Sequence, residues 1–126
     1  MKRWIGRWFM VVAIGHTIFG IFGFGVVHVA DSLPGIISDG VINSIGEDPG
    51  RWGIFWFLFF GFLLFVLGLL IDWAEVNSKV ALPSSLGWYL LVITILGTTM
   101  IPVSGFYLVL PPSVAIIKRP SFLQRK

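Results

Sequence analysis

Two histidines are the residues of this sequence whose side chains could most readily do chemistry. His16 lies inside the apolar run AIGHTIFGIFG, and His28 follows about twelve residues later. On one helix that separation is about 18 Å along the axis and about 120° around it, so the two imidazoles cannot share a metal ion. His16 could still bind haem, a quinone or another apolar molecule, or act as an acid or base. The alternative, which we favour, is a histidine that packs and forms hydrogen bonds, because a metal site needs more than one such ligand.

The other residue types that catalysis uses are scarce. The sequence has no cysteine, which excludes disulfides and thiolate chemistry. It contains none of the phosphate-binding, nucleophile-elbow, zinc-protease or dinucleotide motifs. Asp72 and Glu75 are three residues apart, but they stand at the polar end of an apolar stretch and are expected to be solvated. We therefore predict no catalytic residues, no metal site and no cofactor, with haem at His16 as the alternative, and the sequence leans away from an enzyme.

The composition identifies lipid as the main solvent of the chain. Of 126 residues, 56% are hydrophobic and 12% are charged, whereas soluble domains have roughly 25% charged residues. A chain this small could not cover so much apolar surface with so few charges in water. The length suits a single domain, residues 1–126. Because most basic residues gather near the two ends, no nucleic-acid partner is expected. The predicted partners are membrane lipids, together with other membrane subunits or further copies of the chain.

Four apolar stretches predict an all-α integral membrane protein, built as a bundle of four transmembrane helices. The predicted spans are about 5–29, 51–72, 86–101 and 103–117. Residues 31–48, between the first two spans, are polar and rich in glycine, with apolar residues every four positions from Leu33 to Ile45. This pattern predicts a short interfacial helix after the first span. Asp48 and Pro49 form a typical helix start for the second span.

The distribution of positive charge decides the predicted topology. Four crossings with the amino terminus inside leave only Arg51 of the nine lysines and arginines on the outer side, whereas three crossings divide them almost evenly. The positive-inside rule therefore favours four crossings, with both termini cytoplasmic. Residues 86–117 would be about 48 Å long as continuous helix, short of two crossings of about 30 Å. We therefore predict a fourth span that is broken at Pro111–Pro112 and partly extended.

Small residues recur at helical spacing along the first two spans. Close approach of helices in lipid needs such residues, and they define a predicted packing face made of Gly6, Ala13, Gly20, Gly23, Gly61 and Gly68. His16 shares this face, which directs its side chain into the bundle near mid-membrane. The polar side chains at matching depth lie in the third and fourth spans. If His16 is functional, the predicted ligand-binding site combines His16, Thr94, Thr98 and Tyr107.

Four segments carry a resemblance to known proteins: RWIGRWFMVVAIGHTIFGIFGF, DPGRWGIFWFLFFGFLLFVLGLLIDW, LPSSLGWYLLVITILG and PVSGFYLVLPP. Together they resemble a family of small, uncharacterised bacterial inner-membrane proteins and, more distantly, the DoxX-like four-helix membrane proteins. The resemblance implies a multi-pass protein of the bacterial cytoplasmic (inner) membrane. It brings no established activity. The positions that it singles out are His16, Arg51, Pro102, Ser104 and Gly105.

These features favour a small polytopic membrane protein that acts by helix packing, as a self-associating or accessory subunit of a membrane assembly. A membrane enzyme or ligand-binding protein that uses His16 is the alternative. An oligomeric channel or transporter is a third hypothesis. It is weakened because Asp, Glu, Lys and Arg are missing from the middle of the predicted spans, where proton-coupled transport usually needs them.

Overall fold

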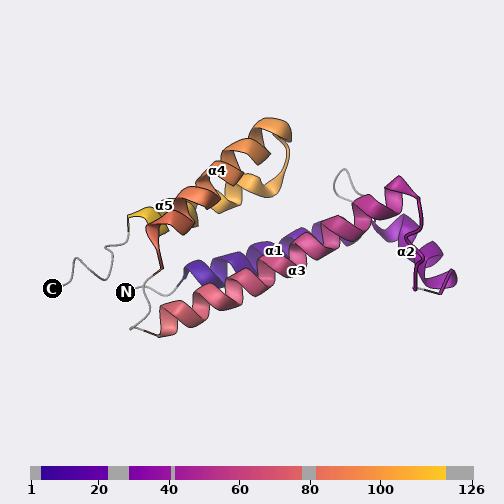
Figure 1. Ribbon diagram of the computed structural model, residues 1–126, viewed down its shortest axis with the longest axis horizontal. Coiled ribbons are helices and arrows are strands. Elements are labelled where there is room, and N and C mark those ends of the chain that lie inside the picture. The colour runs from indigo at the N-terminus through magenta and orange to yellow at the C-terminus, as the bar shows by residue number, and fades with distance from the viewer. Residues whose placement is uncertain (1–3, 23–28, 41, 78–81, 119–126) are drawn as a thin grey trace. The chain divides into compact units, whose positions relative to one another are not determined.

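The computed structural model describes residues 4–22, 29–40, 42–77 and 82–118, and these residues form helices, turns and no strands. In chain order the elements are α1 (Ile5–Ile21), α2 (Val29–Ser38), α3 (Pro49–Val76), α4 (Ser84–Met100), the 3-10 helix η1 (Gly105–Val109) and α5 (Leu110–Ile117) (Figure 1). The predicted all-helical class is therefore confirmed for the described part of the chain.

The longest element, α3, begins where the sequence predicts a helix start. A carboxylate oxygen of Asp48 accepts the backbone N–H of Gly50 at 2.8 Å, which satisfies a donor that the first turn leaves free. Pro49 opens the helix, at a position where its missing N–H costs nothing. The helix runs for 28 residues and is the one described helix that is long and apolar enough to cross a membrane. The bundle of four spans stays a prediction.

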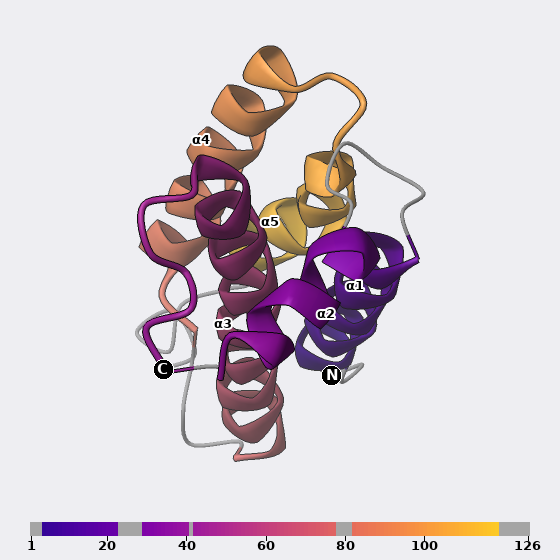
Figure 2. The same ribbon diagram turned by 90° about the vertical axis from the view of Figure 1, so that its right-hand side faces the viewer.

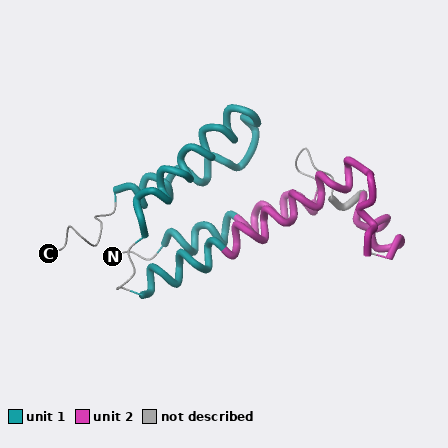
Figure 3. The backbone as a smooth tube through the Cα atoms, in the orientation of Figure 1, with its two compact units in different colours: residues 1–12, 67–126 teal, residues 13–66 magenta. Residues whose placement is uncertain are grey.

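The chain packs as two units, and each is described by itself. The first unit comprises residues 1–12 and 67–126, and the second comprises residues 13–66 (Figure 3). The fully buried side chains of the first unit include Ile5, Phe9 and Ile71. The buried apolar side chains of the second unit include Ala13, Ile54 and Leu64.

Glycines bring α1 and α3 into backbone contact within the first unit. A Cβ at Gly6 would lie 2.5 Å from the Asp72 Cα atom and closer still to its amide nitrogen. A Cβ at Gly68 would lie 2.9 Å from the Met10 amide nitrogen. Real Cβ atoms do not come so close to backbone, so both positions exclude larger residues. The structure buries five residues of the predicted packing face, which are Gly6, Ala13, Gly20, Gly61 and Gly68. Gly23 lies outside the described residues.

Helix α4 packs against η1 and α5 as a hairpin (Figures 1 and 2). Gly87 leaves room for the Ser113 carbonyl, which would lie 2.8 Å from a Cβ at that position, and Gly97 leaves room for the Phe106 ring. The buried residues of the hairpin are Gly87, Leu90, Thr94, Pro112, Ser113 and Ile116. Helix α4 ends at Met100, since a residue that precedes proline, here Ile101 before Pro102, disfavours the helical conformation.

The segment predicted as a broken and partly extended fourth span is helical on both sides of its break. Residues Gly105–Val109 form a 3-10 helix, and Pro111 and Pro112 occupy the first turn of α5 instead of interrupting it. The expectation of extended backbone was wrong because proline is well accommodated at a helix start. At ~2.0 Å per residue for η1 and ~1.5 Å for α5, the two together are about 22 Å long. Helix α4 is about 25 Å long on the same scale.

The interfacial helix predicted within residues 31–48 is shorter than expected. Helix α2 begins at Val29 and ends at Ser38, because Gly40 takes a φ of 92°, a left-handed conformation that stops the helix. Asn43 and Gly46 also have positive φ values, of 58° and 53°. Residues 42–47 therefore form turns. The first predicted span, expected to reach about residue 29, is helical to Ile21, and residues 23–28 lie outside the described part.

Candidate functional site

His16 is held by α3 of its own unit. Its Nε2 atom lies 3.0 Å from the backbone carbonyl oxygen of Phe57. The imidazole stacks on the Phe57 ring with centroids 3.9 Å apart and an interplanar angle of 20°, and it meets Phe60 edge-on at 5.5 Å. A carbonyl oxygen only accepts hydrogen bonds, so Nε2 is the protonated nitrogen of this imidazole. Three contacts thus fix both the orientation and the tautomer of the ring.

Two glycines make this contact possible. A Cβ at Gly61 would lie 2.7 Å from the Thr17 hydroxyl oxygen and 3.2 Å from His16 Cδ2. A Cβ at Gly20 would lie 2.8 Å from Phe57 Cδ1 and closer to another atom of that ring. The hydroxyl of Thr17 donates to the Ala13 carbonyl, one turn back on its own helix, at 3.0 Å. The site is therefore a close contact between α1 and α3, in which the polar side-chain groups are the His16 imidazole and the Thr17 hydroxyl.

The other three predicted ligand-binding residues belong to the first unit, whereas His16 belongs to the second. The hydroxyl of Thr94 donates to the Leu90 carbonyl at 2.7 Å, and that of Thr98 donates to the Thr94 carbonyl at 2.8 Å. Such bonds along one helix use the single hydroxyl proton of each threonine. Tyr107 lies in η1 with 51% of its surface exposed. The structure thus joins Thr94 and Thr98 on one helix, and a site that includes all four residues stays a prediction.

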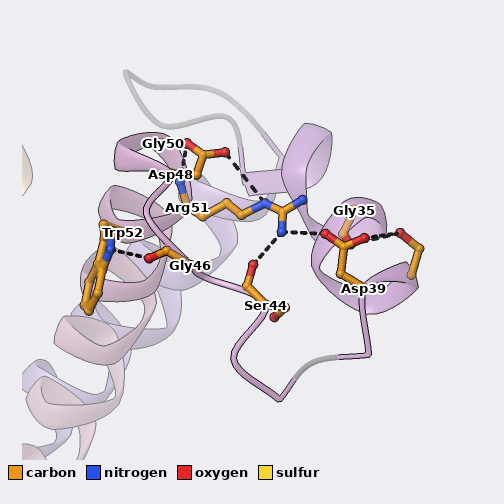
Figure 4. Close-up of polar contacts among 9 residues, drawn as sticks. Gly35, Asp39, Ser44, Gly46, Asp48, Gly50, Arg51 and Trp52 are labelled. Atoms are coloured by element: carbon orange, nitrogen blue, oxygen red, sulfur yellow. Dashed lines mark hydrogen bonds and ion pairs between the residues drawn. The ribbon is translucent and has the colours of Figure 1, made fainter.

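Arg51 is the centre of a polar cluster in the second unit (Figure 4). Its Nη1 atom donates to an Asp39 carboxylate oxygen at 2.7 Å and to the Ser44 carbonyl, while Nε lies 3.7 Å from an Asp48 carboxylate oxygen. The indole N–H of Trp52 donates to the Gly46 carbonyl at 3.0 Å. Arg51 therefore ties the turns after α2 to the first turn of α3, which accounts structurally for a residue that the family resemblance singles out.

A second polar cluster lies in the first unit, at the start of α1. An oxygen of Glu75 accepts the backbone N–H of Gly6 at 2.9 Å, and Glu75 is 8% exposed. Nε of Arg7 lies 3.5 Å from an oxygen of Asp72. A carboxylate from the end of α3 thus satisfies a free amide at the amino end of α1, where negative charge is also favoured. The expectation that Glu75 is solvated was wrong, because no local pattern reveals a partner 69 residues away.

Trp8 compensates for the two prolines of α5. The Leu108 carbonyl would ordinarily accept the N–H of residue 111 in a 3-10 helix or of residue 112 in an α-helix. Both of these residues are proline and have no N–H. The indole Nε1 of Trp8 donates to that carbonyl instead, at 2.7 Å. Part of this contact could be predicted from the sequence. Two consecutive prolines leave a carbonyl in the preceding turn without a backbone N–H, so that carbonyl needs a donor from elsewhere in the protein.

Comparison with known proteins identifies the family of the chain. The family of unknown function DUF6463 matches residues 1–122. The chain belongs to this family. The prediction of an uncharacterised family is thereby confirmed, while the distant DoxX-like resemblance and the bacterial origin stay predictions. No curated protein and no solved structure matches the chain. Within the described residues, no three histidine, aspartate or glutamate side chains lie close enough together to hold a metal ion.

Proposed function

We propose that this protein is a multi-pass protein of the bacterial cytoplasmic membrane that acts as a self-associating or accessory subunit of a membrane assembly. In this proposal the chain crosses the lipid four times, through α1, α3, α4 and the combined η1–α5 segment, and both termini are cytoplasmic. The dense glycine contacts provide stable helix pairs, and the outer faces of those pairs contact lipid and other membrane helices.

The composition of α3 supports the membrane location. Trp52 and Trp73 are about 21 residues apart, which is about 31 Å along a helix and matches a hydrocarbon core of about 30 Å. Both indoles are exposed, at 44% and 59%, as expected for side chains that prefer the headgroup level. The residues between them include many that are both large and apolar and at least 43% exposed, namely Trp56, Phe59, Phe60, Phe62, Leu63, Val66, Leu69 and Leu70.

The hairpin of α4 and α5 supports the same location through its polar groups. The hydroxyls of Thr94, Thr98 and Ser113 all donate to backbone carbonyls four residues earlier in the chain, as expected where water is missing. The opposite face of α4 is apolar and exposed. Each leg of the hairpin is shorter than the hydrocarbon core, a mismatch that local thinning of the bilayer and flanking residues accommodate.

One observation favours a subunit over a helix bundle that faces lipid alone. Aromatic rings line the first half of α3, where the Phe55 ring lies 4.3 Å from that of Phe59 between centroids, tilted by 31°, and meets Trp56 edge-on at 5.3 Å. Phe59 in turn meets Phe62 at 5.9 Å. Residues 66–72 of α3, by contrast, contain no aromatic residue. A pre-ordered aromatic row concentrated along one stretch of a helix is well suited to packing against another helix, because its side chains lose little entropy on contact.

Site-specific photo-crosslinking in native membranes tests the proposal. A photoreactive phenylalanine analogue replaces Phe59 in the aromatic row, and the same analogue at Leu70, which is 59% exposed on the other half of α3, is the control. We expect Phe59 to give a discrete protein adduct of higher mass and Leu70 to give mainly lipid adducts. Recovery of the monomer alone from both positions would contradict the subunit proposal.

A further inference from the structure

We infer that the Nδ1 atom of His16 is a binding site for the hydroxyl group of a membrane-soluble amphiphile, such as a phenol, a quinol or a long-chain alcohol. The inference rests on the proposed membrane location of α1 and α3. It goes beyond the proposed subunit role, because it assigns a ligand class to His16.

The hydrogen bond from Nε2 to the Phe57 carbonyl leaves Nδ1 as a hydrogen-bond acceptor that requires a donor. A neutral imidazole whose Nε2 atom donates a hydrogen bond has one lone pair, on Nδ1, which can only accept. A charged imidazolium is disfavoured in an apolar setting, and no described carboxylate pairs with His16. The two rings that the imidazole contacts, Phe57 and Phe60, carry no hydrogen-bond donor, and no described residue donates to Nδ1. The Thr17 hydroxyl is already committed to the Ala13 carbonyl.

The position of His16 along the helices suits an amphiphile that enters from one leaflet. Its partner Phe57 follows Trp52 by about five residues, so it lies about 8 Å deeper than that indole along α3. Trp73, at the other end, is about 24 Å away on the same scale. His16 therefore lies near the interface marked by Trp52, and not at mid-membrane as the sequence predicts. A hydroxyl just below the headgroups reaches this depth, whereas lipid tails offer no donor there.

The tautomer also discriminates among ligands. An oxidised quinone has only acceptor oxygens and cannot satisfy Nδ1, whereas a quinol or phenol brings the O–H that Nδ1 lacks. Haem binding through Nε2 would require loss of the 3.0 Å contact with Phe57. Phe57 and Gly61 hold the ring in place before any ligand arrives, and such pre-organisation lowers the entropic cost of binding.

A matched pair of probes tests the inference. The full chain, carrying His28→Gln so that His16 is the single histidine, is isotope-labelled and placed in phosphatidylcholine nanodiscs for nitrogen NMR. It is then titrated with para-nonylphenol or with its methyl ether, which lacks only the donor. We expect the phenol to move the Nδ1 resonance and to bind about tenfold more tightly than the ether, a ratio that corresponds to ~1.4 kcal/mol. An unmoved Nδ1 resonance, or equal effects of the two probes, would overturn the inference.

Two further controls keep the result interpretable. Tyr107→Phe removes an exposed hydroxyl of the chain itself, and a changed Nδ1 resonance in this variant without any probe would show an internal donor and refute the amphiphile site. Failure of the chain to enter nanodiscs would contradict the proposed membrane function. The same titration in detergent micelles would then still decide whether Nδ1 binds hydroxyl groups.

Discussion

Replacement of Trp8 by phenylalanine isolates one hydrogen bond on which the α5 region depends. The variant keeps an aromatic ring but loses the indole N–H that donates to the Leu108 carbonyl at 2.7 Å. No backbone N–H can take its place, because residues 111 and 112 are both proline. We therefore expect Trp8→Phe to destabilise the protein specifically through an unpaired carbonyl.

The magnitude follows from the position of the bond. A neutral hydrogen bond contributes about 0.5–1.5 kcal/mol net, and bonds between membrane helices average about 0.6 kcal/mol with a maximum near 1.7 kcal/mol. Leu108 is 44% exposed, so water or headgroups recover part of the loss. We expect a decrease of about 1 kcal/mol in the free energy of unfolding. Trp4→Phe is the matched control, since its ring packs edge-on against Trp8 at 6.2 Å but its indole has no hydrogen-bond partner among the described residues.

The assay is reversible unfolding in mixed micelles with increasing dodecyl sulfate, followed by helical circular dichroism. A double-mutant cycle with Pro112→Ala identifies the cause, because alanine restores a backbone N–H that can reach the Leu108 carbonyl. In that background Trp8→Phe is expected to cost about 1 kcal/mol less than in the natural sequence. Equal costs for Trp8→Phe and Trp4→Phe, together with a coupling energy near zero, would refute the reasoning.

Two further substitutions test other contacts of the structure. Gly6→Ala places a Cβ 2.5 Å from the Asp72 Cα atom, and we expect a loss of about 1–3 kcal/mol from overpacking. Gly15→Ala on the same helix meets nothing within 4 Å and is expected to change stability by less than ~1 kcal/mol, so equal effects in the same unfolding assay would contradict the close α1–α3 contact. Arg51→Gln removes the ion pairs to Asp39 and Asp48, and we expect faster hydrogen exchange at residues 42–46 with nearly unchanged global stability. Arg7→Gln should leave that segment unchanged, and protection in the Arg51 variant equal to that of the natural chain would show that Arg51 does not hold the turns.

The sequence could predict those parts of the fold that depend on interactions between residues close together in the chain. Asp48 and Pro49 correctly indicated the start of α3, because a capping carboxylate and a proline act on the first turn alone. The all-helical class followed from long apolar stretches. The end of α2 was missed, although Gly40 was visible, because a glycine permits a left-handed φ without requiring it.

The parts that could not be predicted depend on partners far along the chain. Trp8 and Leu108 are 100 residues apart, and Gly6 and Glu75 are 69 apart. The Pro111–Pro112 pair was predicted to break the fourth span, but it lies in the first turn of α5. Proline is found both where a helix starts and where a helix breaks, so the residue type alone does not distinguish the two. For the candidate site, the face that His16 shares with glycine predicts an inward side chain, and this stays a prediction. Its bond to the Phe57 carbonyl could not be predicted without the register of the two helices.

The most direct test of the central claim, that the chain crosses the membrane four times, is paired cysteine labelling in intact cells. The sequence contains no cysteine, so single cysteines at Ile42, which is 90% exposed, and at Ser121 report without background. A membrane-impermeant maleimide is expected to label position 42 in intact cells and position 121 only after the membrane is permeabilised. Labelling of position 121 from outside would contradict the four crossings and the cytoplasmic carboxyl terminus.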